Sequence, residues 1–311
     1  MSRLDEIMRK IDGRMEEIDR RVFGVTGEPV GAPPAGVGGG PSPQRAVAGQ
    51  PKGLCRRIGL SVGLDRVDDS VYHGSAAPLQ GCVTDATDFH NILQGAGFEA
   101  RLLRDEEASR GRVVAEIIEA SRKLVAGDLF VMAISGHGAR QDMPNDPSPH
   151  EFWCLWDGML PDTDIVDAFS RFEPGTRIVV VTDQCHSGGV FLPAGSNEKG
   201  IAIPPPLPGR TLPALSLRGA AGRLRSGVNP PMLIQLAACR GRQTSLDSEI
   251  GGRWITALIK CLAVSRDIGW REWFDRAAAH STVGEVSDRQ TPQWVELGPV
   301  TDEFRYGRIL V

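Results

Sequence analysis

Short runs of apolar residues alternate with amphipathic stretches along most of this chain. Apolar runs that end in Gly-rich or polar turns predict buried strands at Ile58 to Val62, Ala100 to Leu103, Asp128 to Ile134, Arg177 to Thr182 and Met232 to Ala237, with a shorter one at Phe152 to Trp156. Helical spacing of apolar residues predicts helices over 81–93, 112–125, 162–172, 254–264 and 270–279. This alternation predicts an α/β domain with a mostly parallel sheet and helices on both faces.

The first 23 residues have a different pattern. Apolar residues recur there at alternating steps of four and three, the spacing of a coiled-coil seam, at Leu4, Met8, Ile11, Met15, Ile18 and Val22. One interpretation is a helix packed on the main domain, and the other is a helix in residues 3–22 that self-associates or docks a partner. Residues 24–54 are dense in Gly, Pro and Ala and predict a flexible linker, which favours the second interpretation.

A second stretch rich in Pro and Gly divides the main domain, residues 55–311. Residues 189–230 contain many Pro and Gly residues and predict a flexible basic linker between a part at 55–188 and a part at 231–311. Against a single acid, Glu198, the stretch carries five bases: Lys199, Arg210, Arg218, Arg223 and Arg225. Loops of this length inside a compact domain are often functional.

Composition and charge narrow the function classes. The 311 residues are 41% hydrophobic and 24% charged with a net charge of −4, so we expect a globular protein that does not bind nucleic acid. No apolar run is long enough to span a bilayer and no signal peptide is evident, so we expect no membrane association and a cytoplasmic location. The six cysteines form no Cys-x-x-Cys pair, and we expect buried, inert thiols at Cys55, Cys154, Cys239 and Cys261.

Two strand ends carry the candidate chemistry. Ser135-Gly136-His137-Gly138 follows one predicted strand, and Asp183-Gln184-Cys185-His186-Ser187-Gly188 follows another. Reactive groups gather at the carboxyl ends of strands in open α/β sheets, so His137 and Cys185 are expected side by side. A neighbouring imidazole raises the thiolate fraction of a cysteine, which indicates a Cys-His peptidase. His186 is an alternative base, although a residue adjacent to the nucleophile usually points elsewhere.

These motifs resemble those of the metacaspases, including their bacterial relatives. His137 precedes Cys185 by 48 residues (185 minus 137), close to the spacing of about 50 in caspases. Two further segments match in the right order: Gly81-Cys82-Val83-Thr84-Asp85-Ala86, and the strand Met232 to Ala237 with the Gly251-Gly252-Arg253-Trp254 that follows it. The resemblance implies a caspase-type three-layer sandwich with a six-stranded sheet, and it places residues 189–230 at the boundary between the large and small subunits.

The resemblance also implies roles for individual residues. It makes Cys185 the nucleophile and His137 the base, with the amides of Gly138 and Cys185 as an oxyanion hole. It implies that Cys82, Asp85, Ser135 and Asp183 line a pocket for Arg or Lys, although Asp85 could instead be the N-cap or a first-turn acid of its own helix. Cleavage after Arg or Lys would expose the basic loop to self-processing at Lys199, Arg210, Arg218, Arg223 or Arg225; the alternative is a merely solvated loop.

No cofactor is required by this chemistry. Many metacaspases bind calcium, but the candidate acids here are scattered along the chain, at Asp142, Asp146, Asp157, Asp162 and Asp164. Two other functions remain open. One is a non-catalytic caspase-fold scaffold that signals through its N-terminal helix, and the other is ligation, rather than hydrolysis, on the same dyad.

Overall fold

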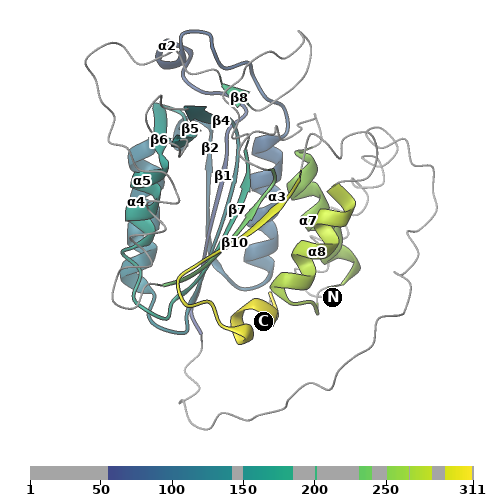
Figure 1. The fold of residues 1–311 in the computed structure, drawn as a ribbon. Coiled ribbons are helices and arrows are strands. Elements are labelled where there is room, and N and C mark those ends of the chain that lie inside the picture. The colour runs from purple at the N-terminus through teal and green to yellow at the C-terminus, as the bar shows by residue number, and fades with distance from the viewer. Residues whose placement is uncertain are drawn as a thin grey trace, which may run out of the picture.

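The chain folds into a three-layer α/β sandwich around a six-stranded sheet (Figure 1). The structure, a computed structural model, describes residues 55–141, 150–184, 200–201, 231–239, 251–265, 267–281 and 291–309. The sheet has the order β10-β9-β7-β3-β1-β2, with bounds Gln293–Leu297, Met232–Ala237, Arg177–Asp183, Leu129–Ser135, Arg57–Gly63 and Glu99–Arg104. Strand β10 pairs antiparallel with β9, and the other neighbours pair parallel. The predicted fold class is therefore confirmed.

Helices cover both faces of this sheet (Figure 1). One face carries α3 (Cys82–Gly95), α7 (Arg253–Val264) and α8 (Trp270–Ser281), and the other carries α4 (Arg110–Lys123) and α5 (Asp162–Phe169). The shorter helical turns are α2 (Asp69–Tyr72), which packs beside the small sheet described below, η1 (Asp105–Glu107) and α9 (Asp302–Tyr306). Among the described residues, no helix has the length and apolar character needed to cross a membrane.

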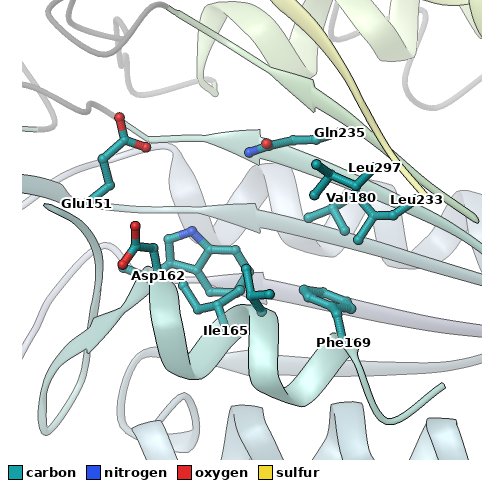
Figure 2. A pocket seen from close by; sticks show the side chains of 10 residues that line it. Glu151, Asp162, Ile165, Phe169, Val180, Leu233, Gln235 and Leu297 are labelled. Atoms are coloured by element: carbon teal, nitrogen blue, oxygen red, sulfur yellow. The ribbon is translucent and has the colours of Figure 1, made fainter. Parts of the chain in front are cut away.

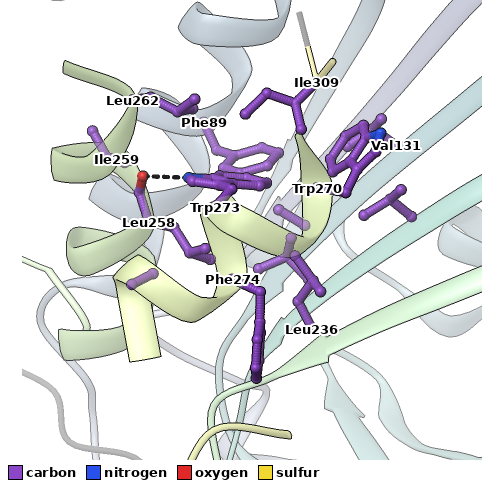
Figure 3. Close-up of a cluster of buried hydrophobic side chains, with 14 of the residues drawn as sticks. Phe89, Val131, Leu236, Leu258, Ile259, Leu262, Trp270, Trp273, Phe274 and Ile309 are labelled. Atoms are coloured by element: carbon purple, nitrogen blue, oxygen red, sulfur yellow. Dashed lines mark hydrogen bonds between the residues drawn. The ribbon is translucent and has the colours of Figure 1, made fainter. Parts of the chain in front are cut away.

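The sheet has an apolar core on each side because successive side chains of a strand point to opposite faces. In β3, Val131 packs on the α3–α7–α8 side, whereas Phe130 and Met132 pack on the α4–α5 side. Figure 3 shows the first core, in which Trp273 of α8 stacks on Phe89 of α3 with ring centroids 6.4 Å apart. Both faces of β3 are buried, which explains why its sequence is a continuous apolar run rather than an alternating one.

A second, four-stranded sheet lies at the carboxyl end of the main sheet (Figure 1). Its order is β6-β5-β4-β8, with bounds Gly158–Pro161, His150–Leu155, Gly138–Gln141 and Gly200–Ile201. Only β5 was expected from the sequence. The two residues of β8 pair with β4 and lie in the stretch 189–230, so the expectation of a stretch without secondary structure is wrong at Gly200 and Ile201.

Some boundaries differ from the sequence predictions for local reasons. Helix α4 begins two residues earlier than expected because the Ser109 hydroxyl accepts a hydrogen bond from the amide of Arg112, at 3.3 Å, and caps the first turn. Strand β10 was not predicted at all. It is short and only half-buried along most of its length, so it lacks the apolar run that identified the other strands.

Candidate active site

The candidate residues meet at the carboxyl edge of the main sheet. Ser135, the last residue of β3, is the register partner of Asp183, the last residue of β7. His137 follows Ser135 by two positions, and Cys185 follows Asp183 by two. Two adjacent parallel strands therefore end at the same level, which brings His137 and the end of β7 to the same edge of the sheet. Cys185 and His186 themselves lie outside the described residues.

His137 is held in a defined orientation. Its side chain is almost fully buried, and its Nε2 atom lies 2.7 Å from the carbonyl oxygen of Ala77. A carbonyl oxygen only accepts hydrogen bonds, so Nε2 carries the proton in this contact. In the neutral ring the lone pair is then on Nδ1, which is the tautomer required of a base that acts through Nδ1. The sequence held no signal for Ala77, because its contribution is a backbone oxygen.

The backbone at His137 is held from two further directions. The amide of Cys154, in β5, donates to the carbonyl oxygen of His137 at 3.1 Å. The side-chain Nε2 of Gln184 donates to the same oxygen at 2.9 Å. Gln184 is fully buried and directly precedes Cys185. Sequence reasoning assigned Gln184 no role, because its partner is a backbone oxygen 47 positions away, which no local pattern indicates.

The two predicted pocket acids lie at the N-terminus of α7. Oδ2 of Asp85 accepts hydrogen bonds from the Ser135 hydroxyl at 3.0 Å and from the amide of Gly252 at 2.8 Å. Oδ2 of Asp183 lies 3.4 Å from the amide of Ile255. Both carboxylates are buried. Gly252 is the N-cap of α7 and has no side chain that could accept hydrogen bonds from the first amides of the helix. Acids from α3 and β7 take this place and face the positive end of the helix dipole.

Asp85 does not cap its own helix. The N-cap of α3 is Gly81, and the carboxylate of Asp65 accepts the amides of Cys82 at 2.7 Å and Val83 at 3.2 Å. The capping role therefore belongs to Asp65, which the sequence analysis did not single out, whereas Asp85 does lie in the first turn of α3, as the alternative interpretation expected. Cys82 is fully buried in the first turn of α3. The structure thus brings Asp85, Ser135 and Asp183 to one place, with Cys82 one turn away on the helix that carries Asp85.

Gly251 shapes the same region. It adopts φ +130°, a backbone conformation that L side chains rarely adopt, and a Cβ atom there would lie 2.5 Å from Oδ1 of Asp85. Both the backbone conformation and the close approach require glycine. The Gly251-Gly252 pair, which the sequence analysis noted only as part of a motif, therefore allows the α7 N-terminus to contact the acid directly.

The remaining thiols of the described chain are poor nucleophiles, with one exception. Cys154 and Cys261 are buried as expected, and desolvation raises the pKa of the Cys154 thiol far above its usual range and that of Cys261 to about 11. Cys239 and Cys82 are also buried. The expectation for Cys55 is wrong: it is exposed, because it precedes β1 at the rim of the sheet, where its sulfur lies 3.4 Å from the carbonyl oxygen of Gly127.

Other predictions fall partly or wholly outside the described residues. Gly138 is the first residue of β4, whereas its proposed oxyanion-hole partner Cys185 is not described. Within the described ranges, no group of three or more His, Cys, Asp or Glu side chains could hold a metal ion. Asp157 accepts the amide of Arg110 at 2.7 Å, and Asp162 and Asp164 lie in the first turn of α5. Outside the description are residues 3–22 and Asp142, Asp146, Lys199, Arg210, Arg218, Arg223 and Arg225.

An apolar cavity lies elsewhere, between α5 and the sheet (Figure 2). Its volume is about 40 Å³, and its walls include Phe169, Leu233 and Leu297, with Glu151 and Asp162 at one end. This volume accommodates a few water molecules at most. No residue of the dyad or of the predicted substrate pocket lines it, so we assign it no part in the chemistry.

The caspase-domain family matches residues 67–296 of the chain. Metacaspase-1 of Kluyveromyces lactis is 30% identical over 171 residues, which are 48% of this chain and 38% of that protein. Metacaspase-4 of Arabidopsis thaliana is 29% identical over 137 residues, 39% of this chain and 32% of that protein. The chain thus matches well under half of the length of these two relatives.

Solved structures show the same architecture. The crystal structure of a Geobacter sulfurreducens protein superposes with a TM-score of 0.65 at 25% identity, covering 81% of this chain and 97% of that one. Caspase-1 from Spodoptera frugiperda superposes with a TM-score of 0.52 at 11% identity, covering 78% and 86%, and shows that the fold is shared.

Proposed function

Because the chain belongs to the caspase-domain family, which comprises cysteine peptidases, we propose that it is a cysteine endopeptidase cleaving after Arg or Lys. The observation that carries the proposal is the state of His137. This histidine is buried at the carboxyl edge of the sheet with Nε2 held by the Ala77 carbonyl, and it follows β3, whose end lies beside the end of β7, two residues before Cys185 in the sequence. A base with a fixed tautomer next to a cysteine-bearing loop is the arrangement that thiol catalysis needs.

In the proposed reaction, His137 accepts the proton of the Cys185 thiol. The thiolate sulfur then bonds to the carbonyl carbon of the substrate, and the peptide C–N bond breaks as His137 returns the proton to the leaving amine. Water attacks the resulting thioester and restores the free thiol. The amides of Gly138 and Cys185 are the proposed donors to the oxyanion, and each such donor is worth roughly 3 to 4 kcal/mol of transition-state stabilisation.

The preference for Arg or Lys rests on the two acids at the N-terminus of α7. Asp85 and Asp183 are buried, and a carboxylate in a region shielded from water attracts a cationic side chain strongly while it repels an acidic one. Each acid accepts a hydrogen bond from a backbone amide at the N-terminus of α7, so its negative charge is held at a defined place, where a guanidinium or ammonium group of the substrate can approach it.

The direct test is hydrolysis of matched fluorogenic peptides that end in Arg, Lys or Asp. We expect cleavage after Arg and Lys, none after Asp, and loss of all cleavage in Cys185→Ala. Cleavage after Asp would contradict the role given to Asp85 and Asp183, and activity that survives in Cys185→Ala would contradict the dyad. A wild-type protein that cleaves no peptide would favour the non-catalytic scaffold. Parallel reactions with calcium and with a chelator test whether the ion is needed.

Self-processing in the basic loop follows from the same preference. The five candidate sites are Lys199, Arg210, Arg218, Arg223 and Arg225. N-terminal sequencing of the purified wild type should reveal a new terminus after one of them, and the Cys185→Ala protein should remain a single chain. A wild type that cleaves peptides but stays intact under the same conditions would contradict this part of the proposal.

Self-association through residues 3–22 is a separate proposal that rests on their heptad spacing alone. Ile11→Glu puts a charge in the middle of the apolar seam. We expect sedimentation to show an assembly for the full chain and a monomer for this variant. Equal masses for the two proteins would contradict a coiled coil and leave the helix packed on the domain.

A further inference from the structure

Gln184 connects the two loops of the candidate active site. Its side chain is fully buried at the end of β7, and its Nε2 donates to the carbonyl oxygen of His137 at 2.9 Å, across 47 positions in the sequence. Its own carbonyl oxygen lies 3.5 Å from the sulfur of Cys239, which follows β9. One residue therefore links the loop after β3 to the end of β7 and to the end of β9.

The acceptor at His137 does not depend on Gln184 alone. The amide of Cys154 donates to the same oxygen at 3.1 Å, so removal of the glutamine amide leaves that oxygen with a partner. The net contribution of one hydrogen bond to stability is small, and the larger penalty for a buried acceptor left without a donor does not arise here. The effect of Gln184 on the free energy of unfolding is therefore small.

The effect of Gln184 on catalysis should be larger, because its hydrogen bond to the His137 carbonyl oxygen determines where His137 lies relative to the end of β7. A displacement of about 1 Å between reacting groups lowers rates on the order of 100-fold. We infer that Gln184 is a positioning residue: its side-chain amide sets the distance between the His137 backbone and the end of β7, and thereby the approach of the imidazole to Cys185. This inference rests on the proposed function, since it assigns the partner of that same dyad.

The geometry identifies the test variant. Gln184→Met keeps the length and burial of the side chain and removes the donor, and Gln184→Leu is a second apolar replacement in case the first does not fold. The matched control is Gln235→Met. Gln235 lies in β9 of the same sheet, and its Nε2 donates to the Thr182 hydroxyl at 3.3 Å without touching His137. Thermal unfolding of all variants shows whether each is folded.

Two readouts separate positioning from stability. The first is steady-state cleavage of the Arg peptide, for which we expect Gln184→Met to lower kcat on the order of 10- to 100-fold with KM within about twofold, and Gln235→Met to change neither by more than about twofold. The second is the pH dependence of Cys185 alkylation by iodoacetamide, followed by mass spectrometry of its peptide. A misplaced imidazole supports the thiolate less, so the apparent pKa of the thiol should rise toward about 8.5.

The outcomes distinguish failure of the positioning role of Gln184 from failure of the proposed peptidase function. Wild-type kcat and alkylation profile in a folded Gln184→Met protein would overturn the positioning role, as would an equal loss in Gln235→Met. If the wild type cleaves no peptide, the proposed function fails by itself. The alkylation profile still tests Gln184 in that case, because alkylation requires no turnover.

Discussion

Substitution of Gly251 by alanine tests the pocket assignment while both acids, Asp85 and Asp183, stay in the sequence. The new Cβ would lie 2.5 Å from Oδ1 of Asp85, whereas ordinary van der Waals contact begins at 3.4 Å, so the carboxylate must retreat by about 0.9 Å. Its Oδ2 bonds to the Ser135 hydroxyl and the Gly252 amide, now 3.0 and 2.8 Å, would be stretched or broken. A substrate cation would meet a displaced charge.

The loss of stability expected for Gly251→Ala has two contributions. A non-glycine residue at φ +130° costs about 1 to 3 kcal/mol, and the overlap with the carboxylate adds about 1 to 3 kcal/mol. We therefore expect the free energy of unfolding to fall by about 2 to 6 kcal/mol. For catalysis, a shift of this size at a binding carboxylate should lower kcat/KM for Arg peptides on the order of 100-fold.

Two other glycines supply matched controls. Gly127 has φ +89°, and a Cβ added to it would meet nothing within 4 Å, so Gly127→Ala adds strain without a clash. Gly111 in α4 has ordinary backbone geometry and equally open surroundings, so Gly111→Ala adds neither and should be neutral or stabilising by up to about 1 kcal/mol. Chemical denaturation and peptide cleavage at matched folded fractions provide the comparison.

Comparison of Gly251→Ala with the two controls tests whether Asp85 is part of the substrate pocket. We expect the kcat/KM values of Gly127→Ala and Gly111→Ala to stay within about twofold of the wild type, while Gly251→Ala loses Arg cleavage. If folded Gly251→Ala retains wild-type kcat/KM and the same preference for Arg, Asp85 is not part of the substrate pocket. An equal loss in Gly127→Ala would instead attribute the effect to reduced stability.

Three further predictions concern charge and reactivity. Asp183→Asn keeps an oxygen for the Ile255 amide but removes the charge, so the ratio of kcat/KM for Arg over norleucine peptides should fall roughly 10- to 100-fold; an unchanged ratio contradicts the pocket role. Iodoacetamide at pH 8 should label exposed Cys55 and spare Cys261 in the native protein, because burial raises the pKa of Cys261 to about 11. Peptide mass spectrometry measures the labelling of each cysteine, and rapid labelling of Cys261 would refute its burial. The hydrogen bond from Arg305 lowers the pKa of the Glu296 carboxyl, so Glu296→Gln should lower the free energy of unfolding, measured with denaturant at pH 7, by about 1 kcal/mol. The difference from the wild type should persist above the unfolded pKa of about 4.3 and vanish as the pH falls through the lower folded pKa. A difference that does not depend on pH would contradict an ionic origin.

The local pattern of apolar and polar residues was sufficient to predict the strands with continuous apolar runs and the helices with one apolar side. Strands β1, β3 and β7 follow from their continuous apolar runs, since a strand covered on both faces must be apolar throughout, and the long helices of the described residues follow from the one apolar side that a surface helix presents. Strands β2 and β9 follow from shorter apolar runs. Strand β10 and the small sheet were missed apart from β5. Their segments are two to five residues long, too short for a period to show, and they form because partners from distant parts of the chain supply the hydrogen bonds.

The same division applies to the candidate site. From the sequence alone we identified the candidate side chains, placed His137 and Asp183 at strand ends and placed Asp85 at the start of a helix, because motif and strand pattern are local properties. Only the tertiary structure decided their partners: the Ala77 carbonyl for His137, the Gly252 amide for Asp85, and the His137 carbonyl for Gln184. Two of these partners are 60 and 167 positions away. All three are backbone groups, which every residue type possesses, so sheet register and helix packing alone decide which of them meets a given side chain.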